Sequence, residues 1–317
     1  MKTETISVVL PSFNYAEYLS QALGSLAAQK NRDWELVAVD DGSTDGSLEI
    51  LRSFSERYSG RVRILTHPGQ ENRGLAKTLR LALDGCRGKT VAFLEADDIW
   101  TPETLTHYLS AFKDHPDAVV VHGTPKMFGD PDLVRKRSAQ YLWRGFPPAG
   151  LDGGLYEAFP YLLKGNVVTT FSSIAVRKEA LLPLDWNTWN EACLDWWLLS
   201  QLAVRGKFFY TPQTVVQRRL HKKSYGMRHE ALSLDKERED HAYRADIRGR
   251  LRTLLSDEMG GNDPDRYRVL MGMLEKRERL EKAVSRGVLR IAKRMLPEAL
   301  KTLLRRVFFL AAYAKAF

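Results

Sequence analysis

The chain has 317 residues, of which 44% are hydrophobic and 27% are charged, and this balance excludes a disordered protein and favours a globular one with a buried core. Its two cysteines, Cys86 and Cys193, are too few for a disulfide scaffold and favour a reducing compartment. Because no long apolar segment follows Lys2, a secretory signal is not expected, and we predict a cytoplasmic protein.

The net charge of +9 is concentrated in the C-terminal third of the sequence. Residues 1–225 hold 27 Lys and Arg against 25 Asp and Glu, whereas residues 226–317 hold 21 against 14. Within the second segment, residues 282–317 carry nine basic residues and a single acid, Glu298. Aromatic residues do not interleave with these basic residues, so nucleic acid is not expected as a partner. The role of the basic C-terminal segment is therefore considered separately from the chemistry of the first two thirds of the chain.

The first hundred residues alternate strand and helix patterns, which predicts an α/β fold with a mostly parallel central sheet flanked by helices. Strands are expected at residues 6–10, 34–39, 62–66 and 90–94, and helices at residues 15–29, 47–58 and 75–83. Pro11 is expected to end the first strand. Ser43, Thr44 and Asp45 are alternative caps for the second helix.

The pattern becomes less regular after this point. Residues 122–165 are rich in Gly, Pro and aromatic residues, and we expect a loop system that shapes a second-substrate site. Further along, a strand is predicted at residues 167–176, a helix at 195–204, and short strands at 208–210 and 214–217. Helical periodicity dominates from about residue 228 to the end, which predicts a helical C-terminal extension.

Carboxylates follow two of the predicted strands at the point where each strand ends. Asp40 and Asp41 follow the second strand, and Glu95, Asp97 and Asp98 follow the fourth. Ligands of open α/β sheets bind at the carboxyl ends of the strands, and a divalent cation allows such an acidic edge to accept a diphosphate. The alternative for the second cluster is an acidic helix start, and the neighbouring acidic pair favours a ligand site. No Gly-x-Gly-x-x-Gly or P-loop sequence is present, so a dinucleotide or P-loop site is not predicted.

Four ordered motifs, spaced as in one family, resemble the family 2 inverting glycosyltransferases of the GT-A fold. They are Val8–Asn14, Val39–Asp45, Glu71–Leu75 and Ala92–Asp98. The resemblance covers about residues 5–225 and implies a GT-A catalytic domain at 1–225. Within that domain it implies a nucleotide-binding half at 1–121 and an acceptor half at 122–225, followed by a helical basic region at 226–317.

The resemblance also implies roles for residues at the donor site. The residues expected to contact the nucleoside lie at the ends of the first two strands and are Pro11, Ser12, Asp40 and Asp41. Asp97 is expected to bind Mn²⁺ or Mg²⁺. Glu95 stands where the family usually has the first aspartate of Asp-x-Asp, and its longer side chain predicts an altered ribose or metal contact. In the basic segment Arg218–Ser224, Arg219 is expected to neutralise the diphosphate, and His221 is either a second metal ligand or structural.

An inverting transferase also needs a general base that takes a proton from the acceptor hydroxyl. The resemblance assigns this role to Asp195, with Leu194 in place of the glutamate often found before it. A helix cap is the alternative role for Asp195, while an apolar surround would raise its pKa and help it act as a base. Nearby tryptophans are expected either to stack on a sugar or to belong to the core: Trp186, Trp189, Trp196 and Trp197.

Residues 286–310 have apolar and basic positions on separate stripes at helical spacing, which predicts a basic amphipathic helix with an interruption near Pro297. The segment is too short and too charged to cross a bilayer, and it suits an anionic membrane surface. Peripheral contact with the inner face of the cell membrane through residues 282–317 is therefore one expectation. Packing against the catalytic domain, or against a second copy in a homodimer, is the alternative.

These features predict metal-dependent, inverting transfer of a sugar from a nucleotide-sugar donor, expected to be a UDP-sugar, to a hydroxyl of a glycan or lipid-linked glycan. One alternative is a sugar-phosphate nucleotidyltransferase, although Pro11–Asn14 lacks the Gly-rich basic loop that such an enzyme needs. Another is a non-catalytic sugar- or membrane-binding protein built on a decayed transferase fold. Glu95 and Leu194 keep that alternative open.

Overall fold

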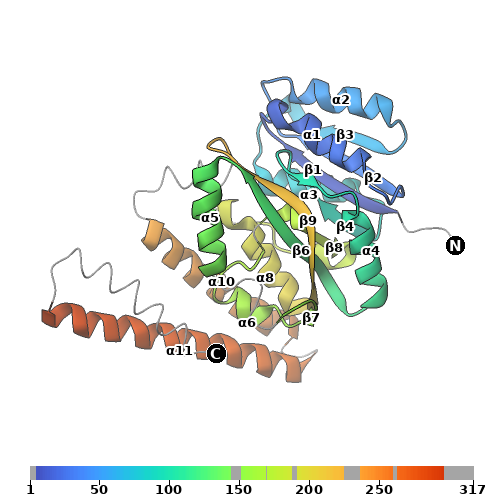
Figure 1. Ribbon diagram of the computed structural model, residues 1–317. Coiled ribbons are helices and arrows are strands. Elements are labelled where there is room, and N and C mark those ends of the chain that lie inside the picture. The colour runs from blue at the N-terminus through green and yellow to red at the C-terminus, as the bar shows by residue number, and fades with distance from the viewer. Residues whose placement is uncertain are drawn as a thin grey trace. The chain divides into compact units, whose positions relative to one another are not determined.

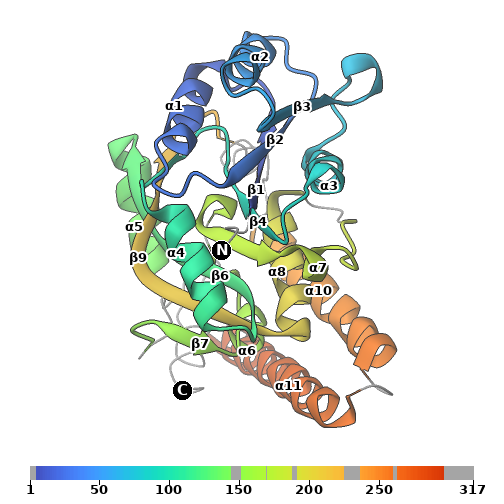
Figure 2. The same ribbon diagram turned by 90° about the vertical axis from the view of Figure 1, so that its right-hand side faces the viewer.

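A computed structural model describes residues 5–143, 151–168, 170–187, 191–224, 236–259 and 263–295 (Figures 1 and 2). The chain divides into two units, residues 1–247 and residues 248–317. Strand β9 ends at Leu220, and the next described element begins at Lys236. The expected division into a catalytic domain at 1–225 and a helical region at 226–317 stays a prediction.

Within the described residues of the first unit, nine strands form one sheet in the order β3-β2-β1-β4-β8-β6-β9-β5, with β7 paired to β9. The strands are β1 (Ile6–Ser12), β2 (Trp34–Asp40), β3 (Val62–Thr66), β4 (Thr90–Phe93), β5 (Ile99–Trp100), β6 (Ala118–Gly129), β7 (Gly154–Tyr156), β8 (Ile174–Arg177) and β9 (Lys207–Leu220). The helices of the first half are α1 (Ala16–Ala27), α2 (Ser47–Arg57), α3 (Leu75–Gly85) and α4 (Thr104–Asp114). Those that follow are α5 (Pro131–Trp143), α6 (Phe159–Leu162), α7 (Lys178–Leu181), α8 (Leu194–Arg205), α10 (Lys236–Met259) and α11 (Pro264–Met295).

The predicted α/β sheet flanked by helices is confirmed, but only its first half is all parallel. Strands β3, β2, β1 and β4 are parallel neighbours, each reached through a helical crossover. Strand β8 is antiparallel to both β4 and β6, and β5 and β7 are antiparallel to β9. Strand β6 is again parallel to β9, so the second half of the sheet is mixed.

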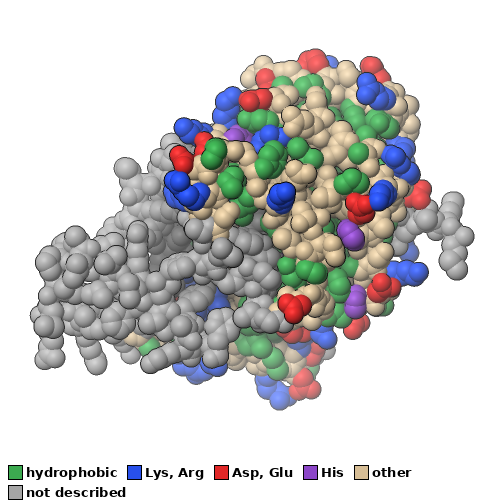
Figure 3. All heavy atoms as spheres, in the orientation of Figure 1, with side chains coloured by type: hydrophobic (Ala, Val, Ile, Leu, Met, Phe, Trp, Pro, Cys, Tyr) green, Lys and Arg blue, Asp and Glu red, His purple; other side chains and the backbone are tan. Residues whose placement is uncertain are grey.

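Helices cover both faces of the parallel strands, which is why β2 is buried along its whole length. Figure 2 shows α1 and α4 on one side of β1 and β4, and α3, α7 and α8 on the other. On the first side, alternate residues of β1 pack against α1, α2 and α4. This core includes Ile6, Val8, Leu10, Leu19, Leu23, Leu26, Leu51, Leu105, Tyr108 and Phe112. On the face seen in Figure 3, acidic and basic side chains are interspersed, in keeping with the near-neutral charge of residues 1–225.

Proline and glycine misled the prediction at several places. Pro11 does not end β1, which continues to Ser12. The backbone of Pro11 faces β4, and β4 already ends at Phe93. The N–H that proline lacks therefore breaks no hydrogen bond between these two strands. The segment expected to be a loop system contains most of β6 and all of α5. Gly123 lies within β6. A side chain at this position would clash with Val215 of β9, and the register of the two strands shifts beside it. The two short strands expected near residues 208 and 214 are therefore one continuous, irregular strand, β9.

Two further details concern side chains that bind backbone N–H groups at helix starts. The strand expected at residues 167–176 begins only at Ile174, because the Thr170 hydroxyl accepts the N–H of Ser172 and caps a 3₁₀ turn at Phe171–Ser173. The N-cap of α2 is Gly46, so none of the three expected residues occupies the cap position, although the Asp45 carboxylate accepts the N–H of Ser47 at 3.0 Å.

The second unit confirms a helical C-terminal extension. Its part of α10 and helix α11 carry paired charges, with Arg248 bound to Glu281 and Arg252 bound to Glu278, each at 2.9 Å. The buried apolar side chains described in this unit are Leu251, Leu255, Leu270, Met271 and Leu274. The predicted helix at residues 286–310 coincides with α11 as far as Met295, and Pro297 lies outside the described residues. No helix in the described ranges is long and apolar enough to cross a membrane.

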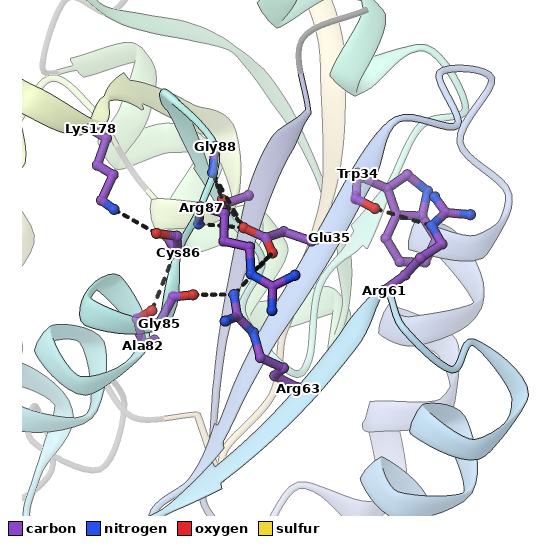
Figure 4. A network of polar contacts seen from close by, with 11 residues as sticks. Trp34, Glu35, Arg61, Arg63, Ala82, Gly85, Cys86, Arg87, Gly88 and Lys178 are labelled. Carbon is purple, nitrogen blue, oxygen red and sulfur yellow. Dashed lines mark hydrogen bonds and ion pairs between the residues drawn. The ribbon is translucent and has the colours of Figure 1, made fainter.

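A buried carboxylate organises the edge of the sheet opposite the acidic strand ends (Figure 4). The Glu35 carboxylate of β2 accepts hydrogen bonds from the Ser7 hydroxyl at 2.6 Å and from the backbone N–H of Arg87 at 2.5 Å, and it pairs with Arg63 at 2.9 Å. Burial raises the pKa of Glu35, but these hydrogen bonds and the Arg63 charge outweigh it, so the net pKa is lowered. The ionised carboxylate therefore joins β1, β2, β3 and the end of α3.

Glu35→Gln is expected to lower the free energy of unfolding at neutral pH by about 1–3 kcal/mol, since hydrogen bonds to a buried charge are lost. A group whose pKa is lowered by folding stabilises the protein above its unfolded pKa, and that stabilisation is lost as pH falls through the folded pKa. The difference between wild type and variant should therefore shrink on acidification below about pH 4. Urea unfolding at several pH values tests this, with the exposed Glu56→Gln as the matched control. A difference that stays constant with pH would contradict the assignment.

Candidate functional site

The ends of β1 and β2 place two buried polar side chains side by side. Ser12 and Asp40 are register partners in the parallel pair, and both are almost fully buried. One carboxylate oxygen of Asp40 accepts the N–H of Ser43 at 3.0 Å. The other oxygen, Oδ1, and the Ser12 hydroxyl are buried without a hydrogen-bond partner among the described residues. Because an unsatisfied buried polar atom costs about 1–3 kcal/mol, this pair is poised to bind polar groups of a ligand.

Asp41, the next residue, is engaged by the protein itself. Its two carboxylate oxygens accept the backbone N–H groups of Arg73 at 2.7 Å and Gly74 at 3.0 Å, and His67 Nε2 lies 3.4 Å away. Asp41 thereby fixes the loop that leads into α3. Its expected contact with the base or ribose stays a prediction. The buried carboxylate oxygen that lacks a hydrogen-bond partner among the described residues belongs to Asp40 and not to Asp41.

The end of β4 carries a second acidic cluster, adjacent to β1. The Thr170 hydroxyl lies within hydrogen-bond distance of both the Glu95 and the Asp98 carboxyl groups, at 2.9 Å from the latter. One hydroxyl has one proton to donate, so both contacts can be hydrogen bonds only if one carboxyl is itself protonated. Burial raises the pKa of Glu95 to about 7, and the negative charge of Asp97 adds to this rise. Burial likewise raises the pKa of Asp98 well above its usual range.

Asp97 and His221, the two residues expected to bind metal, lie together. His221 Nε2 is 2.9 Å from the Asp97 carboxylate, and both side chains are nearly buried, with exposures of 12% and 13%. Tyr15, which precedes α1 as its N-cap, and Tyr18 of α1 contact the imidazole ring. Its Nδ1 is buried without a partner among the described residues. No cluster of three or more His, Cys, Asp or Glu side chains suited to a metal occurs in the described part of the chain.

The two arginines of β9 have different surroundings. The Arg219 side chain donates to the Asp97 carbonyl at 3.0 Å and to Gln21 of α1 at 2.6 Å, and its guanidinium lies over Tyr18. Arg219 thus braces the acidic loop against α1. The charge of Arg218 opposes the rise in the pKa of Glu95 and of Asp98, so Arg218 is the cation that acts on both acids. The expected role of Arg219 toward the diphosphate stays a prediction, and the effect of Arg218 on both acids was not predicted from the sequence.

Asp195 lies in the first turn of α8. The N-cap is Cys193, which argues against the alternative role of Asp195 as a helix cap. The Asn166 side-chain amide donates to Asp195 Oδ2 at 2.7 Å, and the Trp196 N–H donates to Oδ1 at 2.7 Å. The charge of Asp195 contributes to the raised pKa of Glu95, which shows that its carboxylate acts on the acidic cluster.

Three elements hold the start of α8. Glu191 accepts the N–H of Leu75 at 3.2 Å, and at Gly74, whose φ is +85°, any side chain would clash with this carboxylate. The Tyr243 hydroxyl of α10 donates to the Cys193 carbonyl at 2.8 Å, and the Trp196 indole donates to a carbonyl of α6 at 2.8 Å. Sequence reasoning missed Glu191, Asn166 and Thr170, because their partners are distant in the sequence and no motif marks them.

The tryptophans near Asp195 belong to the core rather than to an open sugar-binding surface. Trp186, Trp196 and Trp197 are at most 9% exposed, so the core interpretation holds for these three. Trp189 lies outside the described residues.

Comparison with known proteins gives a consistent result. Residues 7–181, more than half of the chain, match the family described as Glycosyl transferase family 2. An uncharacterized glycosyltransferase of Nostoc sp. is 30% identical over 197 residues, which cover 60% of this chain and 58% of that protein. TuaG of Bacillus subtilis, a candidate teichuronic acid biosynthesis glycosyltransferase, is 33% identical over 125 residues, which cover 39% of this chain and 48% of TuaG. The chain thus spans less than two thirds of the length of these relatives.

Solved structures match over more of the chain. Residues 1–349 of S. aureus TarS in complex with UDP-GlcNAc match with a TM-score of 0.61 and 19% identity, over 85% of this chain and 71% of that one. The mannosyltransferase PcManGT from Pyrobaculum calidifontis, in complex with GDP-Man and Mn²⁺, matches with a TM-score of 0.53 and 19% identity, over 98% and 86%. At such identities the likeness concerns the fold alone, and the expected GT-A-like fold is confirmed.

Proposed function

Because this chain belongs to glycosyl transferase family 2, we propose that it transfers a sugar, with inversion, from a nucleotide-sugar donor to a hydroxyl of a glycan or lipid-linked glycan. The observation that carries the proposal is the convergence of three groups at one sheet edge. They are the unsatisfied Ser12–Asp40 pair, the Asp97–His221 pair beside a buried acidic cluster, and Asp195, whose charge acts on that cluster.

The Ser12–Asp40 pair supports a nucleoside site next to Pro11. Asp40 Oδ1 can accept an N–H of a base, and the Ser12 hydroxyl can donate or accept. A uracil imide and a guanine edge both offer such an N–H. The TarS structure was solved with UDP-GlcNAc, and we extend the uridine donor class to this chain.

The residues near Asp97 fit a divalent cation that the donor shares. Mg²⁺ is commonly held by one or two carboxylates together with substrate phosphates, so Asp97 would hold the cation if the diphosphate supplies most of the remaining ligands, with His221 as the second protein ligand proposed from the sequence. The cation would neutralise the diphosphate as it leaves, assisted by Arg218 and, as proposed from the sequence, Arg219. PcManGT was solved with Mn²⁺, and we propose Mn²⁺ or Mg²⁺ here.

Asp195 is the proposed general base. Its carboxylate would take the proton of the acceptor hydroxyl as the oxygen attacks the anomeric carbon and the nucleoside diphosphate leaves. The named role of TuaG in teichuronic acid biosynthesis supports a glycan as the acceptor class. We further propose that residues 282–317 hold the protein at the inner face of an anionic membrane, where a lipid-linked acceptor would lie.

Removal of the metal and the substitution Asp97→Asn should each weaken UDP binding roughly tenfold or more, because the diphosphate then meets uncompensated carboxylates. Isothermal titration of UDP with Mn²⁺ or with EDTA measures this. Asp84→Asn, an exposed aspartate of α3, is the control and should bind as wild type does. Equal UDP affinity with Mn²⁺ and with EDTA would show that the metal role is wrong.

Asp195→Asn should lower turnover by roughly two to four orders of magnitude, the usual contribution of a general base, with donor affinity nearly unchanged. Turnover is measured as hydrolysis or transfer from a panel of UDP- and GDP-sugars with Mn²⁺. Near-normal kcat would remove Asp195 from the mechanism, whereas lost donor binding would move it to the nucleotide site. No hydrolysis of any donor by the wild type would favour the non-catalytic alternative.

Deletion of residues 282–317 should release the protein from anionic vesicles while UDP binding persists. The segment carries nine basic residues and one acid, and each basic residue near an anionic surface contributes about 1 kcal/mol. The deletion keeps Glu281, the partner of Arg248 and Arg277. Flotation with phosphatidylserine and with neutral vesicles, at low and high salt, compares the two proteins. Equal flotation, or a lower melting temperature or lost dimer after truncation, would instead favour packing on protein.

A further inference from the structure

The side chain of Asn166 has a fixed orientation next to Asp195. Its Oδ1 accepts the backbone N–H of Val168 at 2.9 Å, and its Nδ2 donates to Asp195 Oδ2 at 2.7 Å. An amide has one accepting and one donating end, so these two contacts define which way it points. The loop turn at residues 166–168 thus aims an N–H donor at the carboxylate.

The two oxygens of Asp195 are held from different elements. The Trp196 N–H of α8 binds Oδ1 at 2.7 Å, and Asn166, from the loop after α6, binds Oδ2. With both oxygens held, rotation of the carboxylate is restrained. A carboxylate oxygen can accept more than one hydrogen bond, so the contact with Asn166 does not by itself prevent an acceptor hydroxyl from reaching Oδ2.

We propose that Asn166 is a positioning residue for the transfer reaction, and that its amide holds the Asp195 carboxylate in the orientation needed to take the acceptor proton. The inference rests on the proposed role of Asp195 as the general base. Asn166 makes no proposed contact with donor or acceptor and acts only through Asp195. A misplacement of about 1 Å at a reacting group can cost roughly a hundredfold in rate, so the loss of this contact is measurable.

Two substitutions separate the positioning role from a structural one. Asn166→Asp is nearly isosteric and keeps an acceptor for the Val168 N–H, so the loop turn is retained, but it replaces the donor to Asp195 with a second carboxylate. Asn166→Ala loses both contacts. If Asn166 positions Asp195, both variants should lower kcat roughly ten- to a hundredfold with donor Kd unchanged. If it only caps the loop, Asn166→Asp should reach the wild-type kcat once the pH exceeds the raised pKa of Asp195, and only Asn166→Ala should be impaired there.

The chain offers a matched control at a second Asn–Asp contact. The Asn187 amide donates to Asp185 at 2.9 Å in an exposed loop of the same half. Asn187→Asp makes the same chemical change away from Asp195, and it should leave kcat and donor Kd as in wild type. A comparable loss of kcat in Asn187→Asp would overturn the specific role of Asn166.

The pH dependence provides a second readout. Two carboxylates in contact raise each other's pKa, so the acid limb of the kcat profile of Asn166→Asp should move to higher pH. Activity should recover only in part as pH rises, because the donor to Asp195 is still missing, and full recovery would overturn the positioning role. Glu95, whose charge also interacts with Asp195, is present in every variant. Carboxyl ¹³C NMR of the apo protein, with Asp195 assigned through Asp195→Asn, should show the same upward shift without any donor. An unshifted titration of Asp195 would overturn the proposal.

A double-mutant cycle distinguishes the failure of this inference from the failure of the proposed function. In the Asp195→Asn background, Asn166→Ala should cause no further loss of kcat, because the residue acts through Asp195. If Asp195→Asn alone has normal kcat, the proposed base is wrong. If Asp195→Asn is inactive while Asn166→Asp retains wild-type kcat and pH profile, only the role of Asn166 is wrong.

Discussion

The structure depends on how carboxylates are accommodated where the parallel strands end. The buried Asp98 and the partly buried Glu95 lie within reach of one hydroxyl, that of Thr170, which has a single proton to donate. Burial raises the pKa of both acids, the charge of Asp97 raises it further, and Arg218 compensates only in part. Without a cation these raised pKa values favour the protonated, neutral forms of the two acids. A divalent cation beside them would favour the ionised forms and link the edge to an anionic ligand, which agrees with the proposed metal-bound diphosphate.

A second requirement is that the two halves of the site keep a fixed relation. Asp41 and Glu191 bind three successive backbone N–H groups at the start of α3, those of Arg73, Gly74 and Leu75. Because Asp41 follows β2 and Glu191 precedes α8, the N-terminus of one helix joins the nucleotide half to the segment that carries Asp195. The favourable interaction of carboxylates with a helix N-terminus stabilises this junction. Tyr243 supports the same segment from α10, so the segment that carries Asp195 is held by several elements of the first unit.

The sequence was sufficient to predict the acidic strand ends, because a strand pattern followed by aspartates is local and parallel strands bring their carboxyl ends together. It was insufficient for Thr170, Asn166 and Glu191, whose partners are 29 to 116 residues away. It also misjudged β6, since Gly123 indicated a loop whereas the close approach of Val215 is what excludes a side chain there. Proline at position 11 was similarly misread, because its effect depends on where β4 ends. Local chemistry was thus predictable, and contacts set by tertiary packing were not.

The position of Glu95 bears on whether the site is active or decayed. A glutamate in place of the family's aspartate predicted an altered ribose or metal contact, and this kept a non-catalytic alternative open. In the structure its longer side chain reaches Thr170, which also binds Asp98, so the extra carbon is used in a hydrogen bond within the protein. Asp97 is not drawn into that network, and its carboxylate faces His221 instead. The side chain of Glu95 therefore stays in contact with the acidic cluster beside Asp97. The substitution is thus compatible with an active site whose metal contact depends on Asp97 and His221.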